Sequence, residues 1–300
     1  MVQFKTVTLR DKAWVDEIVM AENSPSADYN FGNIYIWDKH YRQLVCRFGG
    51  RMLTKLRYDG KPTFVFPIGT GPLRPAVEAL REFAASRDYP FCLRGITEKH
   101  RQMLEEEYPG RFDYKEDTDC ADYIYRAERL SSYAGKALHG KKNHCNRFEA
   151  ENDWDFVPLT RELIPGCLDM LDLWSEENSR RLDKSIAYEH DAIIRAFAAY
   201  EQLGLEGGVL RISGKLVGFT VGEFACRNTF NVHFEKAEGS INGAYPMVCR
   251  EFTRMLMAKY PLLEYMNRED DMGFESLRQS KLSYKPEYLL KKYTARWRDD

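Results

Sequence analysis

The 300-residue sequence has no long run of apolar residues. No window approaches the roughly 18 consecutive apolar residues that a membrane-spanning helix needs, so we expect no integral membrane association. The N-terminal residues also lack a basic segment followed by an apolar one, which argues against a secretory signal peptide. Together these absences predict a cytoplasmic protein.

The sequence also lacks the cysteine spacing of a metal site or a disulfide framework. Its 7 cysteines are odd in number and scattered, and none belongs to a Cys-x-x-Cys pair. His139 and His144 are five residues apart beside Cys145, which is not a standard zinc spacing. We therefore expect reduced thiols and no bound metal.

A strong charge of one sign is missing too. The chain has 44 Lys and Arg against 46 Asp and Glu, which leaves a formal net charge of −2. It therefore has no global field for a long nucleic acid, and any polyanion site must be local. The segment from Arg129 to Phe148 carries five Lys or Arg and no Asp or Glu, which favours an anionic or polar ligand there.

What the sequence does contain is enough apolar material for two globular domains. Hydrophobic residues make up 44% and aromatic residues 13% of the chain, which excludes low-complexity disorder. A similar order of elements is predicted twice. In the first half we expect helices at 10–22, 75–86 and 97–107 and strands at 44–48, 52–58, 63–68, 91–94 and 122–126. In the second half we expect helices at 163–178, 188–202, 243–259 and 274–280 and strands at 154–158, 208–213, 216–224, 229–236, 263–266 and 287–295.

This order predicts an α/β fold with mixed sheets in two tandem domains. We expect an N-terminal domain at 1–134, a basic connecting helix at 135–152 and a C-terminal domain at 153–300. The prediction of a duplication rests on element order, since the halves share no repeat at the residue level.

The second half resembles the GNAT acyltransferase fold in its β-β-β-α-β-α-β order and in the Ser-Gly-Lys-Leu-Val-Gly hairpin at 213–218. In that fold, a splayed central strand exposes backbone groups to the acyl donor, and the loop before the next helix offers N–H groups to a pyrophosphate. The corresponding loop, 240–245, keeps Gly243 but has Ser240 where the family has Gln or Arg. It also ends in Tyr245 where the family has Gly or Ala. These departures argue against an ordinary acetyl-coenzyme A enzyme.

Three segments narrow the family further. Residues 135–148 have the form Gly-Lys-x-x-His-x-Lys-Lys-Asn-x-x-Asn-x-Phe, residues 231–237 read Asn-Val-His-Phe-Glu-Lys-Ala, and residues 265–286 contain Asn-Arg-Glu-Asp-Asp and Leu-Arg-Gln-Ser-Lys-Leu-Ser-Tyr-Lys-Pro. Over nearly the whole chain, these resemble soluble bacterial proteins related to the C-terminal catalytic domain of phosphatidylglycerol lysyltransferases.

The resemblance implies a tandem GNAT fold, as in the Fem-type aminoacyltransferases, and transfer of an amino acid from aminoacyl-tRNA to an amine or hydroxyl. The membrane-embedded N-terminal region of the lysyltransferases is absent from this sequence. We therefore expect a small-molecule or cell-envelope precursor acceptor rather than a bilayer phospholipid.

The basic segment is predicted to form an amphipathic helix. At 100° per residue, Leu138, Cys145 and Phe148 share one side. The other side forms a polar arc whose cations, imidazole and carboxamides are candidate substrate-binding groups: Lys136, His139, Lys142, Asn143 and Asn146. The alternative is a solvated helix face.

An acidic segment follows a predicted strand, a common position for sites in open α/β sheets. Asn267, Arg268, Glu269 and Asp271 are candidate substrate-binding residues and Asp270 is a candidate general base. The alternative is an acidic cluster at a helix N-terminus, with Arg268 in a structural ion pair.

A second basic stretch contains Arg278, Lys281 and Tyr284, which could hold a tRNA 3′ end or an anionic acceptor, or form a surface helix that stops before Pro286. On the strand at 229–236, His233 and Glu235 point to the same face. Glu235 is thus a second candidate base, and a structural His–Glu pair is the alternative.

We therefore predict a monomeric cytoplasmic aminoacyltransferase that uses the acceptor end of aminoacyl-tRNA as co-substrate and needs no other cofactor. Its catalytic base would be Glu235 or Asp270. A coenzyme A-dependent N-acyltransferase and a non-catalytic GNAT-fold binding protein are the alternatives.

Overall fold

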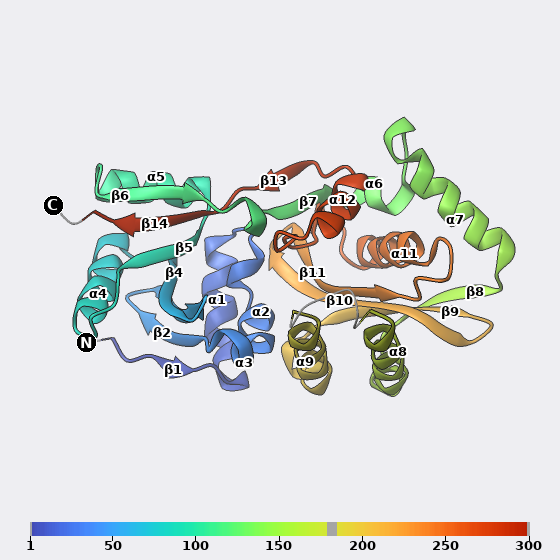
Figure 1. Cartoon of the computed structure of the whole chain (residues 1–300), viewed down its shortest axis with the longest axis horizontal. Helices are drawn as coiled ribbons and strands as arrows, with labels where there is room; N and C mark the ends of the chain where they lie inside the picture. The colour runs from blue at the N-terminus through green and yellow to red at the C-terminus, as the bar shows by residue number, and fades with distance from the viewer. Residues whose placement is uncertain (1, 179–184, 299–300) are drawn as a thin grey trace. The chain divides into compact units, whose positions relative to one another are not determined.

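The computed structural model describes residues 2–178 and 185–298, and its elements form two compact units (Figure 1). Each unit is built around a seven-stranded mixed sheet. Unit 1 takes in the described residues up to Asp122, the segment Asp270–Phe274 and the described residues from Leu289 onward. Unit 2 comprises Tyr123–Glu269, apart from the undescribed residues, and Glu275–Tyr288.

The sheet of unit 1 has the strand order β1-β2-β3-β4-β5-β14-β6, in which β4 and β5 are parallel and the other neighbours antiparallel. Its strands are β1 (Lys5–Thr6), β2 (Leu44–Phe48), β3 (Arg51–Tyr58), β4 (Lys61–Gly69), β5 (Cys92–Ile96), β14 (Tyr293–Trp297) and β6 (Phe112–Glu116). The helices are α1 (Lys12–Glu22), α2 (Phe31–Ile36), α3 (Asp38–Tyr41), α4 (Leu73–Ala85) and α5 (Glu98–Glu107).

The sheet of unit 2 has the order β13-β7-β12-β11-β10-β9-β8, with β11 and β12 parallel. Its strands are β13 (Tyr288–Leu290), β7 (Asp122–Arg126), β12 (Tyr265–Asn267), β11 (Thr229–Ala237), β10 (Lys215–Cys226), β9 (Glu206–Ile212) and β8 (Trp154–Pro158). The helices are α6 (Ala127–Ser132), α7 (His139–Glu151), α8 (Ile164–Asn178), α9 (Ser185–Ala198), α10 (Tyr200–Leu203), α11 (Ala244–Lys259) and α12 (Glu275–Ser283).

The two sheets share one topology. In each, antiparallel strands lead to a single parallel pair, β4–β5 or β11–β12, and an antiparallel strand then follows the parallel pair. That following strand comes from the other half of the sequence, because β14 pairs with β5 and β7 pairs with β12. The compact units are therefore discontinuous in sequence, unlike the contiguous domains at 1–134 and 153–300 that we expected.

The predicted fold class, two tandem GNAT-like α/β units, is confirmed. The sequence did not predict α2, α3, β6 or α6. The segment of α2 and α3 is rich in aromatic residues and Asn, which have low helix propensity, and packing of Phe31, Ile34 and Ile36 in the core overrides it. The single strand expected at 287–295 is two strands, β13 and β14, in different sheets.

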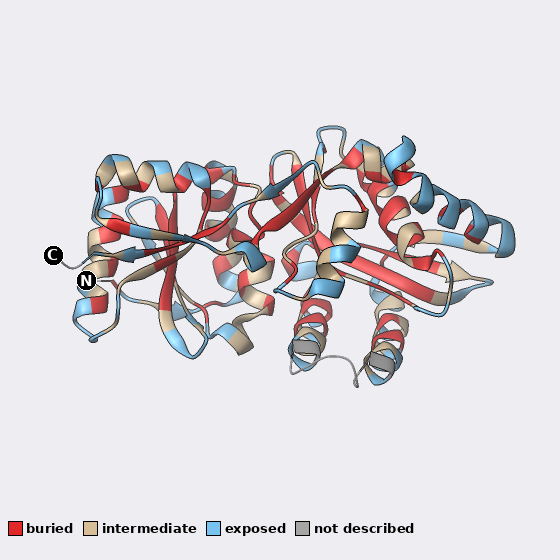
Figure 2. Ribbon diagram, turned by 45° about the horizontal axis from the view of Figure 1, so that its top comes forward, coloured by how far each residue is buried: buried red, intermediate tan, exposed pale blue. Residues whose placement is uncertain are grey.

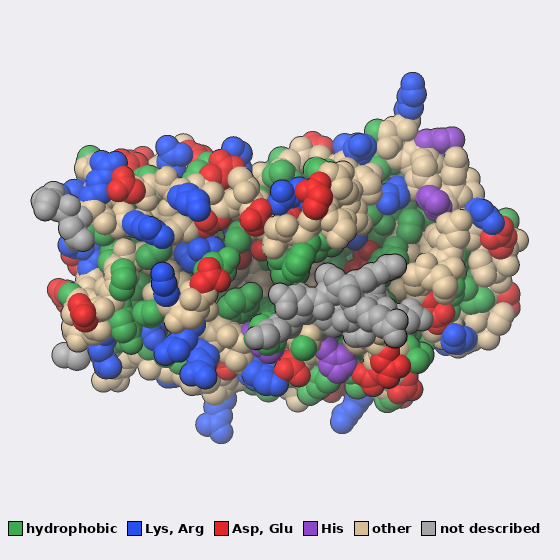
Figure 3. Space-filling view, in the orientation of Figure 1, with side chains coloured by type: hydrophobic (Ala, Val, Ile, Leu, Met, Phe, Trp, Pro, Cys, Tyr) green, Lys and Arg blue, Asp and Glu red, His purple; other side chains and the backbone are tan. Residues whose placement is uncertain are grey.

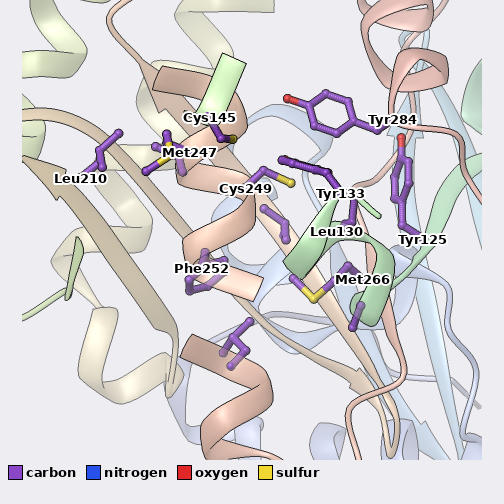
Figure 4. Packing of buried hydrophobic residues seen from close by; sticks show 14 of the residues in the cluster. Tyr125, Leu130, Tyr133, Cys145, Leu210, Met247, Cys249, Phe252, Met266 and Tyr284 are labelled. Carbon is purple, nitrogen blue, oxygen red and sulfur yellow. The ribbon is translucent and has the colours of Figure 1, made fainter. Parts of the chain in front are cut away.

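The central strands of each sheet carry its core, as the burial colours in Figure 2 show. In unit 2, α11 packs on the sheet with α6 and α7, and a cluster of tyrosine rings and thiols lies under these helices (Figure 4). Tyr284 lies 6.5 Å from Tyr125 and 6.0 Å from Tyr133, measured between ring centroids. No helix in the described ranges is both long and apolar enough to span a bilayer.

Candidate functional site

The parallel pair β11–β12 in unit 2 is short, and this shortness creates the candidate site. Only three residues of each strand are paired, Thr229–Asn231 with Tyr265–Asn267. β11 continues to Ala237, whereas the chain leaves the sheet after Asn267. Side chains rather than backbone groups therefore connect the second half of β11 with the residues that follow β12.

Glu235 and Arg268 form the first of these connections. Nη2 of Arg268 donates to Oε1 of Glu235 at 2.7 Å, and the two side chains are only 14% and 9% exposed, Arg268 being the former. Burial raises the pKa of Glu235, although three cations oppose this shift: Arg268, Lys281 and Lys141. Burial alone would lower the pKa of Arg268, but the charge of Glu235 holds it well above its usual range.

Two lysines complete this set of charges. Nζ of Lys281 donates to the carbonyl oxygens of Arg268 and Glu269, the latter at 3.2 Å. Nζ of Lys141 lies 3.9 Å from the ring centroid of Tyr284, and the Arg268 guanidinium lies 4.5 Å from the same ring. Burial and the charge of Arg268 both lower the pKa of Lys141. Three cations thus surround one carboxylate, which favours an anionic or electron-rich ligand.

Two buried polar atoms beside Glu235 have no hydrogen-bond partner within the described protein. They are Nη1 of Arg268 and Oγ1 of Thr220, and a third such atom, Oδ1 of Asn231, lies elsewhere on β11. Thr220 lies directly opposite Glu235 in the β10–β11 register, whereas the register shift between Val221 and Gly222 places Asn231, which pairs with Glu223, on the other face of β11. Buried polar groups are nearly always paired in native proteins, so one donor and one hydroxyl left beside Glu235 indicate a polar ligand.

His233 belongs to a separate network on the other face of β11, with Asn231 and Glu223. The prediction that His233 and Glu235 point to the same face is wrong, because a β-bulge lies between them. Its Nδ1 lies 2.9 Å from Oε1 of Glu269 and its Nε2 lies 3.0 Å from Oε1 of Glu223. Burial lowers the pKa of His233, but the hydrogen bonds to both carboxylates outweigh burial and raise this pKa to about 9. The imidazole is therefore protonated at neutral pH and acts as a rigid ionic link, while Glu235 remains with Arg268.

The acidic segment after β12 is divided between different roles. Oδ1 of Asn267 accepts from the backbone N–H of Glu269 at 2.7 Å, and Oδ1 of the buried Asp271 accepts from that of Gly273 at 2.9 Å. These two side chains stabilise turns. Asp270 lies in unit 1, where its negative charge contributes to the raised pKa values of Tyr41 and Cys120.

The predicted polar arc on α7 is exposed, and Figure 2 shows this helix in pale blue along most of its length. Its members on α7 are His139, Lys142, Asn143 and Asn146, and Nδ2 of Asn143 lies 3.3 Å from Nδ1 of His139. Lys136 is exposed in the 3-10 turn that precedes α7. The residue of α7 that reaches Tyr284 is Lys141, which the sequence pattern did not single out. The sequence feature that could have identified Lys141 is its position in the helical projection, where it falls on the apolar face with Leu138, Cys145 and Phe148.

The second basic stretch is also divided. Tyr284 is buried and Lys281 half-buried in the cluster around Arg268. Arg278 lies at 4.0 Å from Glu275 on the surface of α12. The structure thus places Glu235, Arg268, Lys281 and Tyr284 together, with Glu269 bound to the neighbouring His233.

The loop before α11, where a GNAT enzyme holds a pyrophosphate, is occupied by the protein itself. The N–H groups of Ile241 and Ala244 donate to carbonyl oxygens of Glu238 and Ile241. Gly243 has φ +89°, and a Cβ on it would lie 2.5 Å from the carbonyl oxygen of His144. Nδ1 of His144 also lies 2.7 Å from Oδ1 of Asn242, so α7 is packed directly against this loop.

The equivalent positions of unit 1 are filled as well. Arg51 donates to the carbonyl oxygen of Gly71 in the loop before α4, at 2.7 Å, and to that of Pro67 near the end of β4, at 2.6 Å. Beyond the two-residue β4–β5 pairing, Phe66 stacks on His100 at 4.1 Å between ring centroids, and Oη of Tyr29 lies 3.1 Å from Nδ1 of His100. The unsatisfied polar atoms around the Glu235–Arg268 pair therefore make unit 2 the better candidate for a ligand site.

Comparison with known proteins connects this fold to a family. The family model described as "Phosphatidylglycerol lysyltransferase, C-terminal" matches residues 21–296. A crystal structure of a conserved protein of unknown function from Bacteroides thetaiotaomicron VPI-5482 is 35% identical. It has a TM-score of 0.94 and the alignment covers 99% of this chain and 100% of that one.

More distant structures share the fold alone. L-PGS from Bacillus licheniformis is 14% identical with a TM-score of 0.65, covering 99% of this chain and 93% of that one. FemX is 11% identical with a TM-score of 0.62, and the alignment covers 97% of this chain and 96% of that one. An uncharacterized protein of Mycoplasmoides gallisepticum is 28% identical over 176 residues, which are 57% of this chain and 54% of that protein, so the matched region spans about half of that relative.

Proposed function

The chain belongs to the family of the phosphatidylglycerol lysyltransferase C-terminal domain, and from this premise we propose that it is an aminoacyltransferase. It would move an aminoacyl group from aminoacyl-tRNA to an amine or hydroxyl acceptor, and the Glu235–Arg268 cluster of unit 2 would be its reaction site. The observation that carries the proposal is the set of buried, unsatisfied polar atoms next to a carboxylate and three cations.

The chemistry needs one base and one group that stabilises an oxyanion. In the proposed step, the acceptor amine attacks the ester carbonyl carbon and Glu235 takes the proton that the amine loses. Nη1 of Arg268 donates to the carbonyl oxygen as it becomes negative. This attack forms the C–N bond. The C–O bond to the ribose breaks when the tetrahedral intermediate collapses, and the proton on Glu235 passes to the departing 3′ oxygen.

The raised pKa of Glu235 supports its role as base, because a carboxylate with a raised pKa holds an abstracted proton better than an exposed one. Oγ1 of Thr220, directly opposite Glu235, is suited to receive the α-ammonium group of the aminoacyl moiety. Asp270, the other candidate base, belongs to unit 1. Asp270→Asn is therefore the informative comparison with Glu235→Gln.

The occupied loops favour this donor over coenzyme A. Backbone hydrogen bonds and the packing of α7 take up groups that a pyrophosphate would use before α11, and Arg51 holds the corresponding loop before α4. A binding protein without activity would have the same fold, so activity must be measured directly.

We would measure release of ¹⁴C-labelled amino acids from a charged tRNA pool, one amino acid per reaction. The acceptor mixtures would be a small-molecule extract, a cell-wall precursor fraction and phosphatidylglycerol vesicles. We expect label in a product that is neither RNA nor free amino acid. Glu235→Gln should lower the rate roughly 100- to 10,000-fold, whereas Glu264→Gln, an exposed carboxylate of the same unit, should leave it unchanged.

Two results would contradict the proposal at different levels. If no charged tRNA loses label to any acceptor faster than by spontaneous hydrolysis, the aminoacyltransferase proposal is wrong. If transfer occurs and Glu235→Gln is fully active while Asp270→Asn is not, the proposed aminoacyl transfer stands, but its base is Asp270 and not Glu235.

A further inference from the structure

A basic groove lies in unit 1, apart from the residues of the Glu235–Arg268 cluster. It is formed by β1, β2, β3 and α3 and encloses about 460 Å³. Its lining contains four cations and one carboxylate: Lys39, Arg42, Lys55, Arg57 and Asp38. Figure 3 shows Lys and Arg side chains gathered over this region of β1, β2 and α3.

Three of the four cations of this groove lack a carboxylate partner among the described residues. Lys and Arg side chains next to the groove have carboxylate partners, such as Lys5 with Asp11 and Arg47 with Glu17. Within the described residues, Arg42, Lys55 and Arg57 have no ion pair. Lys55 is half-buried, and burial together with the charges of Arg57 and Arg87 lowers its pKa. Such mutual repulsion is relieved when an anion binds.

The backbone conformation of Arg42 is a further feature of this groove. Arg42 ends α3 with φ 48° and ψ 54°, a left-handed conformation that favours glycine at a helix C-terminus. Arginine is strained in this conformation, and it places a charge at the edge of the groove.

The spacing of the cations fits a chain of phosphates better than a single one. Lys55 and Arg57 alternate along β3 and so lie roughly 7 Å apart on one face, and Lys39 and Arg42 approach from α3. A nucleic acid strand presents one negative charge per nucleotide along its length. None of the large apolar side chains that the described structure exposes lines the groove, whereas a membrane-binding surface usually adds apolar groups.

We propose that this groove is a docking site for the phosphate backbone of RNA. The inference rests on the proposed function for the identity of the RNA, a tRNA. Unit 1 would hold the body of the donor through its phosphates, independently of sequence, while unit 2 handles its aminoacyl end.

The test measures binding of a fluorescent uncharged tRNA by anisotropy between 25 and 200 mM KCl. Lys55→Gln/Arg57→Gln removes two cations of the groove. Lys115→Gln/Arg296→Gln is the matched control, because it removes two exposed cations, without ion pairs among the described residues, from β6 and β14 toward the opposite edge of the same sheet. We expect at least a tenfold weaker affinity at 50 mM KCl for the groove variant only. The slope of log K against log salt should fall in magnitude by about 0.7 to 0.9 for each phosphate that the variant no longer neutralises.

Arg42→Gly provides an independent readout. Because glycine relieves the left-handed strain, we expect an unfolding midpoint at least equal to the wild-type value together with weaker tRNA binding. A purely structural role for Arg42 predicts the opposite pattern, with a lower midpoint and unchanged binding.

Three results would overturn the inference. The first is equal tRNA affinity and equal salt slope for the two double variants. The second is complete displacement of tRNA by inorganic phosphate at millimolar concentration. The third is that the protein binds phosphatidylglycerol vesicles but not tRNA, and that the groove variant abolishes the vesicle binding. The first points to a solvated face, the second to a small-anion site and the third to a membrane surface.

Turnover separates this inference from the proposed function. The groove variant should raise KM for full-length aminoacyl-tRNA at least fivefold and leave turnover of a short 3′-aminoacyl oligonucleotide unchanged. If both donors react but neither responds to the groove variant, the docking inference is wrong and the proposed function stands. If no donor reacts, yet tRNA binding depends on the groove, the docking site stands and the aminoacyltransferase proposal is wrong.

Discussion

At the scale of single residues, the Glu235–Arg268 pair is the feature that most needs energetic testing. Removing one member of a buried ion pair leaves the other charge uncompensated, at a cost of about 3 to 5 kcal/mol, whereas replacing both is often nearly neutral. We expect Arg268→Met to lower the free energy of unfolding by about 3 kcal/mol and Arg268→Met/Glu235→Leu to recover most of that loss. Urea unfolding measures both values. The double variant should still be inactive, and an active one would show the pair to be structural.

His233 gives a pH-dependent prediction. Its pKa is about 9 in the folded protein against an ordinary value of 6.5, so protonation favours the folded state. This stabilisation is complete below pH 6.5 and is lost as pH rises from 6.5 to 9, a loss of about 3 kcal/mol. The pH dependence of urea unfolding over this range should therefore be flatter in His233→Phe. His144→Gln, which alters an exposed histidine, should keep the wild-type slope.

The candidate site shows how far residue patterns reach. The order of elements places Arg268 just beyond β12 from the sequence alone. Strand alternation predicted one face for His233 and Glu235, but the β-bulge between them, which the sequence pattern did not indicate, puts them on different faces. Lys141 could not be selected, because a helical projection assigns the apolar side to the core and gives no reason for a lysine there. The roles of Asn267 and Asp271 in turns depend on backbone conformations that follow from the packed structure.

At the scale of elements, contact between α7 and the loop before α11 is fixed by the absence of a side chain at Gly243. Gly243→Ala would combine a left-handed φ with a methyl group 2.5 Å from the His144 carbonyl oxygen, so we expect a loss of at least about 2 kcal/mol of unfolding free energy. Gly140→Ala is the control, because no atom lies within 4 Å of its Cβ position and alanine favours the helix. Thermal unfolding of both variants tests this, and a neutral Gly243→Ala would mean that α7 is not held against the loop.

The elements themselves were predictable where periodicity is strong. The strands at 44–48, 122–126 and 154–158 have the predicted bounds, since each is set off by turn residues or a charged neighbour. β6 was missed because its sequence Phe-Asp-Tyr-Lys-Glu is largely polar, as suits a strand at the edge of a sheet. The break between β13 and β14 has no signal in the sequence, because it depends on which sheet each strand joins.

At the scale of the whole molecule, the duplicated topology followed from element order, but the exchange of strands did not. A sequence shows which segments form strands, and local periodicity is the same whichever sheet a strand completes. β14 carries Tyr293, Thr294 and Ala295, all buried in the sheet of unit 1. Long-range contacts determine that β14 joins the sheet of unit 1. Among them are the ion pairs of Lys292, whose Nζ lies 2.7 Å from Oδ1 of Asp122 and 2.9 Å from Oδ1 of Asp28.

The exchange makes a prediction about fragments. Residues 1–134 lack β14, which lies between β5 and β6, and residues 135–300 lack β7, which lies between β12 and β13. The first fragment would also leave the Asp122 and Asp28 carboxylates without the cation of Lys292. We expect neither fragment alone to unfold cooperatively, while co-expression of the two restores a single cooperative transition. Joining residues 291–298 to the end of 1–134 through a Gly/Ser linker should restore cooperativity to that fragment, because it supplies the missing strand and the lysine. Circular dichroism during urea unfolding distinguishes these cases, and cooperative unfolding of unmodified 1–134 would mean that unit 1 is stable without strand exchange.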